Sequence, residues 1–306
     1  MGAAHRRPGY VAAVTDVAPT DVAPTDVAVT GVDCHCHVFA ARGVETPAVA
    51  GAAYSPPALD VNDHAAHLAA VGCERGVLVQ PSVFGADHRC LVASLRQRPR
   101  KLRGVACVPP GTPLAELDDL HAAGVRATRL QDGMPGGVPV GALNPVSDMV
   151  APWGWHIEIW TDIRRHLDWL GDAIRRCPVP VVFDHLGGLP SDVGPEHPAM
   201  VLLTDLLADG QVWVTLSGSE RLMVATAPGG GAADVAAHED SIADRVRALA
   251  DIAPDHLLWG SDWPHVGLAH APSATQLRAR LARWLPDTEV RRRVLVDNAM
   301  GRYRFD

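Results

Sequence analysis

Lysine is almost absent from this sequence: Lys101 is the only one among 306 residues, and all other positive side chains are arginines apart from histidine. Lys101 lies in the polar stretch RQRPRKLRG. Chemistry that depends on a lysine, such as a Schiff-base nucleophile or a carbamate ligand, would therefore have to use this one residue. No other position in the chain can supply it.

The sequence also lacks an excess of positive charge and a long apolar run. Against 27 Lys and Arg there are 35 Asp and Glu, a formal net charge of −8 at pH 7, which argues against a nucleic-acid surface. No run of about 18 apolar residues occurs, so we expect no membrane span. The N-terminus has no apolar segment of the signal-peptide type.

The six cysteines form no disulfide framework. They are scattered, mostly within apolar segments, as Cys34, Cys36, Cys73, Cys90, Cys107 and Cys177. Cys34 and Cys36 alternate with two histidines, but a structural zinc site would need a second pair at similar spacing, and the sequence has none. We therefore predict reduced thiols and a cytoplasmic protein.

Residues 1–28 contain little material for a hydrophobic core. The near-repeat TDVAPTDVAPTDVAVT occupies 15–30, and short repeats rich in proline and aspartate bury little apolar surface. We predict a disordered or loosely packed tail at 1–28 and one domain at 29–306. Whether the tail serves as an oligomer contact, and whether the protein is a homodimer, stays open at this point.

After residue 30, short β-branched segments alternate with longer amphipathic segments. The predicted strands are 31–35, 75–80, 103–108, 124–130, 155–160, 179–185, 212–218 and 256–262. Helical patterns lie between most of them, for example at 61–72, 113–124, 163–177 and 241–252. Continuous apolar strands covered by helices are typical of a parallel sheet.

The number and spacing of these segments indicate the α/β class and a single-domain barrel. Eight strands alternating with helices over about 250 residues have the size of a (β/α)8 TIM barrel. A doubly wound open sheet is the alternative, and it would be expected to carry a glycine-rich turn after its first strand. That position holds HCHVFA (35–40), so we predict the barrel.

The segment GVDCHCH (31–37) places two histidines two residues apart at the end of the first predicted strand. Residues i and i+2 of a strand point to the same face. We therefore expect His35 and His37 to face the mouth of the barrel, and Cys34 and Cys36 to face the helix layer. Two imidazoles side by side suit a metal or a polarised substrate better than a core.

Polar residues end other predicted strands as well, and the carboxyl ends of the strands form the catalytic face of such barrels. They are Gln80, Ser82, Arg129, Asp184, His185, Ser217, Arg221, Asp262 and His265. One such residue alone is more often a helix cap or a satisfied rim residue. Their occurrence on several strands together indicates an active site.

Three motifs carry a resemblance to a known family. HCHVF (35–39), FDHLG (183–187) and GSDWPH (260–265), in this order on the first, sixth and eighth strands, resemble the amidohydrolase superfamily. With VQPSVFGAD (79–87) and LSGSERL (216–222), the chain is similar to the branch of 2-pyrone-4,6-dicarboxylate hydrolases and related lactonases, from about residue 31 to the C-terminus. The resemblance implies a carboxylic ester hydrolase that opens a small anionic lactone, in the catabolism of aromatic compounds.

The resemblance also implies roles for individual residues. His35, His37, His185 and Asp262 match the catalytic positions, with Asp262 as the general base that takes a proton from the attacking water. The histidines would hold a divalent metal or polarise the lactone carbonyl directly. The residues that match substrate-binding positions, or that face the substrate beside them, are Tyr54, Ser82, Arg129, Trp160, Arg221 and His265. The paired N–H donors of arginine suit a carboxylate.

Two positions depart from that branch. Its members carry a further arginine a few residues after the position of Arg129, whereas the loop LQDGMPGGVPVGALNP (130–145) has no basic residue. They also have tyrosine where this chain has Trp160. A buried substrate charge that loses its partner costs about 2–5 kcal/mol. We therefore expect a mono-anionic lactone, such as a muconolactone or a sugar-derived lactone, rather than pyrone dicarboxylate.

The cofactor and the reaction class each have an alternative. Three imidazoles and a carboxylate suit one Zn²⁺ or Mn²⁺ ion, yet the pyrone-dicarboxylate branch works without metal. A metal-dependent decarboxylase or hydratase of the same superfamily, acting on an aromatic or unsaturated acid, would use the same four residues. The segments QPSVFGAD and SDWPH, together with Arg221, favour the lactonase. A non-enzymatic binding module would not need this complete polar set.

Overall fold

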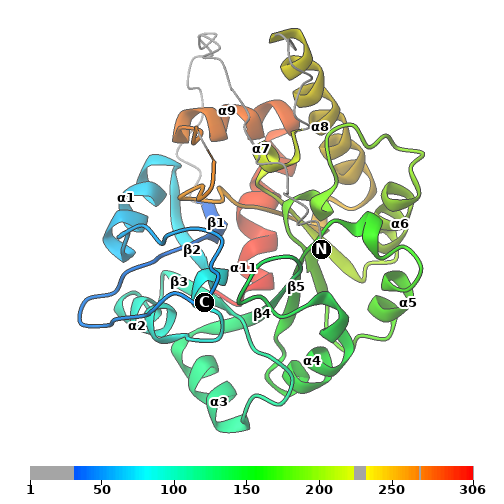
Figure 1. Cartoon of the computed structure of the whole chain (residues 1–306). Coiled ribbons are helices and arrows are strands. Elements are labelled where there is room, and N and C mark those ends of the chain that lie inside the picture. The colour runs from blue at the N-terminus through cyan, green and yellow to red at the C-terminus, as the bar shows by residue number, and fades with distance from the viewer. Residues whose placement is uncertain (1–30, 224–231, 269, 306) are drawn as a thin grey trace, which may run out of the picture.

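The computed structural model describes residues 31–223, 232–268 and 270–305, so the predicted tail at 1–28 lies outside the described residues. Eight parallel strands follow one another around a single sheet in chain order. They are β1 (Gly31–Cys36), β2 (Cys73–Val79), β3 (Leu102–Ala106), β4 (Val125–Gln131), β5 (His156–Trp160), β6 (Val181–Phe183), β7 (Val212–Leu216) and β8 (Leu257–Trp259). The predicted (β/α)8 barrel is confirmed, with the strands at the centre and helices around them (Figure 1).

The helices follow the strands as the sequence pattern indicated. They are α1 (Val61–Ala70), α2 (Arg89–Gln97), α3 (Leu114–Ala123), α4 (Leu143–Val150), α5 (Leu170–Arg175), α6 (Pro198–Ala208), α7 (Ser219–Leu222), α8 (Ala232–Ile252), α9 (Ala274–Trp284), α10 (Thr288–Arg292) and α11 (Asn298–Arg302). Local chemistry sets their ends: Asp60 accepts hydrogen bonds from the amides of Asn62 and Asp63 and so begins α1. None of the helices in the described ranges has the length and hydrophobicity needed to cross a bilayer.

The helix predicted at 163–177 is wrong as one continuous element. A single turn of 3₁₀-helix (Ile163–Arg165) is followed by α5. Between them the Nε2 atom of His166 lies 2.8 Å from the Oδ2 atom of Asp132, in the loop after β4. This tertiary contact interrupts the helix between Arg165 and Leu170. The amphipathic pattern of the segment gives no sign of such a contact.

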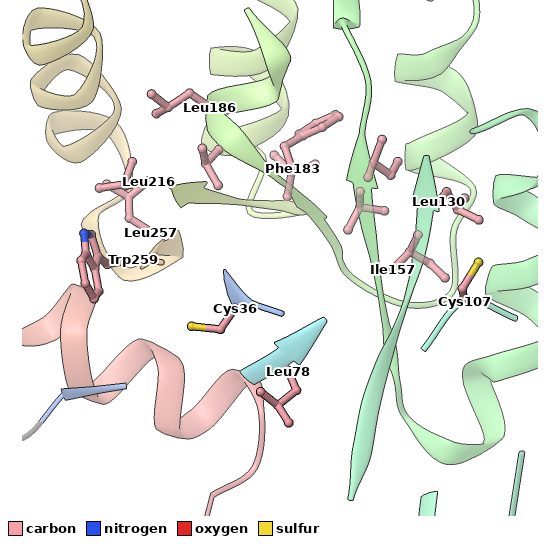
Figure 2. Packing of buried hydrophobic residues seen from close by; sticks show 14 of the residues in the cluster. Cys36, Leu78, Cys107, Leu130, Ile157, Phe183, Leu186, Leu216, Leu257 and Trp259 are labelled. Atoms are coloured by element: carbon pink, nitrogen blue, oxygen red, sulfur yellow. The ribbon is translucent and has the colours of Figure 1, made fainter. Parts of the chain in front are cut away.

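Two separate hydrophobic clusters lie on the two faces of the sheet. The outer cluster packs strand residues against the helices, and Figure 2 shows some of its members on several strands, including Cys36 on β1, Leu78 on β2, Leu130 on β4 and Phe183 on β6. The inner cluster fills the barrel below the mouth. Its members are Val32, Cys34, Val77, Val79, Val105, Ala127, Val182, Leu258, Ala299, Tyr303 and Phe305. The last three close the amino-terminal end of the barrel.

The side-chain alternation predicted for β1 is wrong at Cys34. Between Asp33 and Cys36 the strand advances three residues, while β2 advances two, from Gly76 to Leu78. This irregularity is a β-bulge, in which two residues of one strand oppose one of its neighbour. Cys34 therefore belongs to the inner cluster, whereas Cys36 lies in the outer cluster as predicted.

Candidate active site

The four predicted catalytic residues converge on one carboxylate oxygen at the mouth of the barrel. The Nε2 atoms of His35, His37 and His185 each lie 3.9 Å from the Oδ1 atom of Asp262. They come from β1, the segment after it, the segment after β6 and the segment after β8. All four side chains are buried. Strand parity and the motif order thus predicted residues that the structure brings together.

Two of the imidazoles are oriented by the nitrogen that faces away from Asp262. The Nδ1–H of His37 donates to the backbone oxygen of Val79 at 2.8 Å, because a carbonyl can only accept. The Nδ1 atom of His185 lies 2.8 Å from the hydroxyl of Ser217. Contacts of this kind fix both the ring orientation and the tautomer. The Nε2 lone pair of His37 is therefore directed into the site.

Asp184 lies beside the third imidazole and binds a predicted substrate-binding arginine. Its Oδ1 atom lies 3.4 Å from Nδ1 of His35, and its Oδ2 atom accepts a hydrogen bond from Nε of Arg129 at 2.9 Å. The guanidinium of Arg129 lies 5.6 Å from the centre of the Trp160 ring, and Trp160 meets His185 edge-on at 6.0 Å. Trp160 thus packs between a cation and an imidazole of the site.

Burial and neighbouring charges set the protonation of these groups. Burial lowers the pKa values of His37 and His185 to about 3, so both imidazoles are neutral at pH 7. Burial alone would raise the pKa of Asp262, but Arg221 and the imidazoles outweigh it and hold that pKa well below its usual range. The Nε–H of Arg221 donates to Oδ2 of Asp262 at 2.6 Å. Asp262 is therefore an ionised carboxylate.

Backbone conformations that favour glycine occur at three predicted site residues. The φ angles of His185, Asp262 and His265 are +50°, +65° and +60°, in the left-handed region that side chains disfavour. The amide of Asp262 donates to the oxygen of His35 at 2.9 Å, and the amide of His265 donates to the oxygen of Asp262 at 2.9 Å. Backbone bonds thus hold the strained segment after β8 against the end of β1.

Two glycines allow the imidazoles to approach the backbone closely. A Cβ atom on Gly218 would collide with the ring of His185, and one on Gly260 would collide with the backbone and Cβ of His35. Both glycines belong to motifs that carry the resemblance, LSGSERL and GSDWPH. Their place in these motifs follows from packing against the catalytic histidines.

The predicted substrate-binding residues also gather at this mouth. Burial raises the pKa of Tyr54, while a hydrogen bond with the Ser82 side chain and the charges of Arg129 and Arg221 lower it. His265 is buried, and its Nδ1 atom has no hydrogen-bond partner among the described residues. Arg129 is bound to Asp184 and Arg221 to Asp262, and the charges of both act on the tyrosine hydroxyl.

Sequence reasoning assigned no role to three buried polar residues near the site. Asp184 and Ser217 stand in the sequence only as strand ends, yet Ser217 orients His185 and Asp184 lies beside His35 while it binds Arg129. Glu158 points inward two residues before Trp160, a spacing that could have revealed it. Burial and the Asp184 carboxylate raise the pKa of Glu158 well above its usual range, and the Tyr303 hydroxyl donates to its Oε1 atom at 2.7 Å.

The donor set fits a single divalent metal ion. Ligand atoms of His35, His185 and Asp262 lie within 4.8 Å of one another, and the Nε2 atom of His37 is at the same distance from Asp262 as theirs. The Nε2 atom of His35 is buried and has no hydrogen-bond partner in the described part of the chain. Neutral imidazoles and an ionised carboxylate are the ligands that Zn²⁺ and Mn²⁺ accept.

Comparisons with known proteins cover the whole barrel. An amidohydrolase family profile matches residues 32–305. A 4-sulfomuconolactone hydrolase of Rhizobium radiobacter is 32% identical over 274 residues, 87% of each chain. A 2-pyrone-4,6-dicarboxylate hydrolase of Comamonas testosteroni is 33% identical over 282 residues, 89% of each chain. The apo crystal structure of an Agrobacterium tumefaciens protein is 25% identical, with a TM-score of 0.77 over 90% of this chain and 96% of that one.

Proposed function

This chain belongs to the amidohydrolase family, and from that premise we propose that it is a lactonase that hydrolyses a small anionic lactone. The observation that carries the proposal is the convergence of three Nε2 atoms on one oxygen of an ionised Asp262, with Arg221 bound to the other oxygen. Two relatives that match most of the chain at 32% and 33% identity are hydrolases of anionic cyclic esters.

Asp262 is the general base in this proposal. Its Oδ1 atom faces the imidazoles and takes the proton of the water that attacks the ester carbonyl. Arg221 keeps the carboxylate ionised but also lowers its affinity for that proton. A substrate anion bound beside Arg221 would offset the guanidinium charge, so substrate binding itself would make Asp262 a better base.

The protonation of His37 favours a metal over direct polarisation of the substrate. Because its Nδ1–H faces the oxygen of Val79, its neutral ring offers a lone pair at Nε2 and has no proton there to donate to a carbonyl. We propose that His35, His37, His185 and Asp262 hold one Zn²⁺ or Mn²⁺ ion. Such an ion, when bound, supplies a Lewis acid for the ester carbonyl.

The anion is bound by Arg129 and Arg221 beside Tyr54. The Nε–H donors of the two guanidiniums are engaged by Asp184 and Asp262, and one terminal nitrogen of Arg221 also donates to the oxygen of Val266. We propose that the remaining terminal N–H groups bind the anion. The loop 130–145 supplies no further cation. A lactone with one anionic group, of the muconolactone or sugar-derived type, matches this supply of positive charge better than a dicarboxylate.

The test is a lactone panel with defined metal content. Purified protein is assayed with 4-sulfomuconolactone, muconolactone, a sugar lactone, 2-pyrone-4,6-dicarboxylate and a neutral lactone, as isolated, after chelation and after Zn²⁺ or Mn²⁺ is restored. We expect ring opening, highest for the mono-anionic lactones and restored by metal. Release of CO₂ from an aromatic acid without any lactone opening would contradict the proposal. A cytoplasmic location stays a prediction, and whether the protein is a homodimer stays open.

A further inference from the structure

Asp33 lies behind the site, on the side of β1 away from the three imidazoles that surround Asp262. Its side chain is fully buried. One oxygen, Oδ1, accepts hydrogen bonds from two backbone amides: that of His35 at 3.3 Å and that of Ser261 at 2.8 Å. A single carboxylate oxygen thus joins β1, which carries His35, to the segment that carries Asp262.

The first of these bonds explains how β1 tolerates its bulge. Three steps along β1, from Asp33 to Cys36, match two steps along β2. A bulge leaves one residue without its place in the ladder, and a buried amide without a partner is costly. The Asp33 side chain supplies an acceptor for the amide of His35. His35 can then follow Cys34 into the barrel and reach the site.

The second bond is part of a group of contacts that fixes the segment on both sides of Asp262, whose φ angle is +65°. Before it, the amide of Ser261 donates to Asp33. After it, the amide of Trp263 donates to the Ser261 hydroxyl at 3.0 Å. His67 of α1 closes the arrangement: its Nε2 atom lies 3.2 Å from Oδ2 of Asp33 and 2.9 Å from the Ser261 hydroxyl, and its ring stacks on Trp263.

We propose that Asp33 is a positioning residue: through the amides of His35 and Ser261 it sets the separation between the imidazole of His35 and the carboxylate of Asp262. His67 and Ser261 hold the Asp33 side chain in place for this task. Asp33 touches neither the substrate nor the reacting atoms. The expected changes in kcat rest on the proposed lactonase function, whereas the expected change in the separation of His35 and Asp262 does not.

The test compares Asp33→Ala and Asp33→Asn with a control at the other end of β8. The control is Asn298→Ala, because the buried Asn298 amide donates to two backbone oxygens, those of Pro254 and Leu257, at 2.8 Å each. It therefore removes two hydrogen bonds that also anchor β8, but far from the imidazoles. Melting temperature, kcat, KM and a crystal structure are measured for each variant.

Asp33→Ala is expected to lower kcat at least about 100-fold with little change in KM, since a displacement of about 1 Å is enough for such a loss. Asp33→Asn keeps an acceptor oxygen and should recover kcat to within about tenfold of the original protein. Asn298→Ala should lower the melting temperature and leave kcat within about threefold. A simple loss of stability would give the same kinetics in Asp33→Ala and Asn298→Ala, and that result would overturn the inference.

Two further readouts keep the inference testable if Asp33→Ala does not fold or if no lactone is turned over. Ser261→Ala removes the bonds to Trp263 and His67 while keeping its own amide, and should lower kcat with a folded barrel. Crystal structures should show the Nε2 atom of His35 displaced from Oδ1 of Asp262 in Asp33→Ala and, to a smaller extent, in Ser261→Ala. An unchanged separation in Asp33→Ala would overturn the inference even if the proposed function failed for its own reasons. If Asp33→Ala does not fold, an unchanged separation in Ser261→Ala would overturn it.

Discussion

The upper and lower halves of the barrel interior are built from the same strands but differ in charge, polarity and backbone conformation. The upper half, at the carboxyl ends, holds ionised groups, neutral imidazoles and residues at positive φ, as at Asp262. The lower half is mainly a cluster of apolar side chains closed by Tyr303 and Phe305. Two buried polar residues of β5 also contact Tyr303: His156 packs edge-on against its ring, and Glu158 accepts a hydrogen bond from its hydroxyl.

Single strands show the change from one half to the other. On β4 it runs from Ala127 to Arg129, and on β6 from Val182 to the following Asp184. Each step is two residues, the repeat of a strand. Residues near the carboxyl ends of the strands form the site, whereas residues near the amino ends form the core. A substitution at the carboxyl end should therefore affect turnover, and one at the amino end should affect stability. Four substitutions test this separation.

Asp262→Asn should give the largest effect on turnover. The amide keeps the shape of the carboxylate and an acceptor for Arg221, but it cannot take a proton from water. We expect kcat to fall by roughly 10²–10⁴ while the protein stays folded. Steady-state kinetics and a thermal melt check this, and a kcat near that of the original protein would remove Asp262 from the mechanism.

Leu258→Ala is the counterpart in the lower half, on β8, the strand that leads to Asp262. Leu258 is fully buried in the inner cluster, and removing such a side chain leaves a cavity that costs about 2–5 kcal/mol of stability. The kcat of the folded protein should be unchanged at a temperature well below the melt. A fall in kcat comparable to that of Asp262→Asn would mean that the two halves are not separable.

Arg221→Met should act on binding and on the pH profile together. An anionic lactone loses a charged partner, which should raise KM about 10- to 100-fold, whereas a neutral lactone should be affected little. Arg221 lowers the pKa of Asp262, so its loss raises that pKa. Because the active form is the ionised carboxylate, the acid limb of kcat/KM should move to higher pH. Equal losses for both lactones with an unshifted limb would make Arg221 purely structural.

Glu158→Gln should give the smallest effect, on stability alone. The pKa of Glu158 is raised in the folded protein, so the folded state keeps a proton that the unfolded state releases above about pH 4.3. The stability that Glu158 contributes is therefore complete at low pH and is lost as the pH rises. The glutamine variant should melt higher than the original protein at pH 8, with a smaller difference at pH 5 and little change in kcat. An equal difference at both pH values would contradict this linkage.

The strands and the catalytic residues could be predicted because their signals are local. Apolar segments of strand length recur along the chain, and His35, His185 and Asp262 lie in short motifs that end them. The misplaced features depend on contacts between distant segments. Cys34 turns inward because the Asp33 side chain satisfies a bulge, and the helix at 163–177 breaks where His166 meets Asp132. No periodicity in the chain encodes either contact.

The hydrogen bond between Asp33 and Ser261 also has a consequence for how the enzyme comes into being. It joins positions 228 residues apart in the chain, and contacts of such separation form only after most of the intervening chain is ordered. A nascent chain that ends before β8 carries all three histidines of the site but lacks Asp262, the proposed base. The site is therefore inactive until β8 has been synthesised, and activity becomes possible only when β8 completes the barrel.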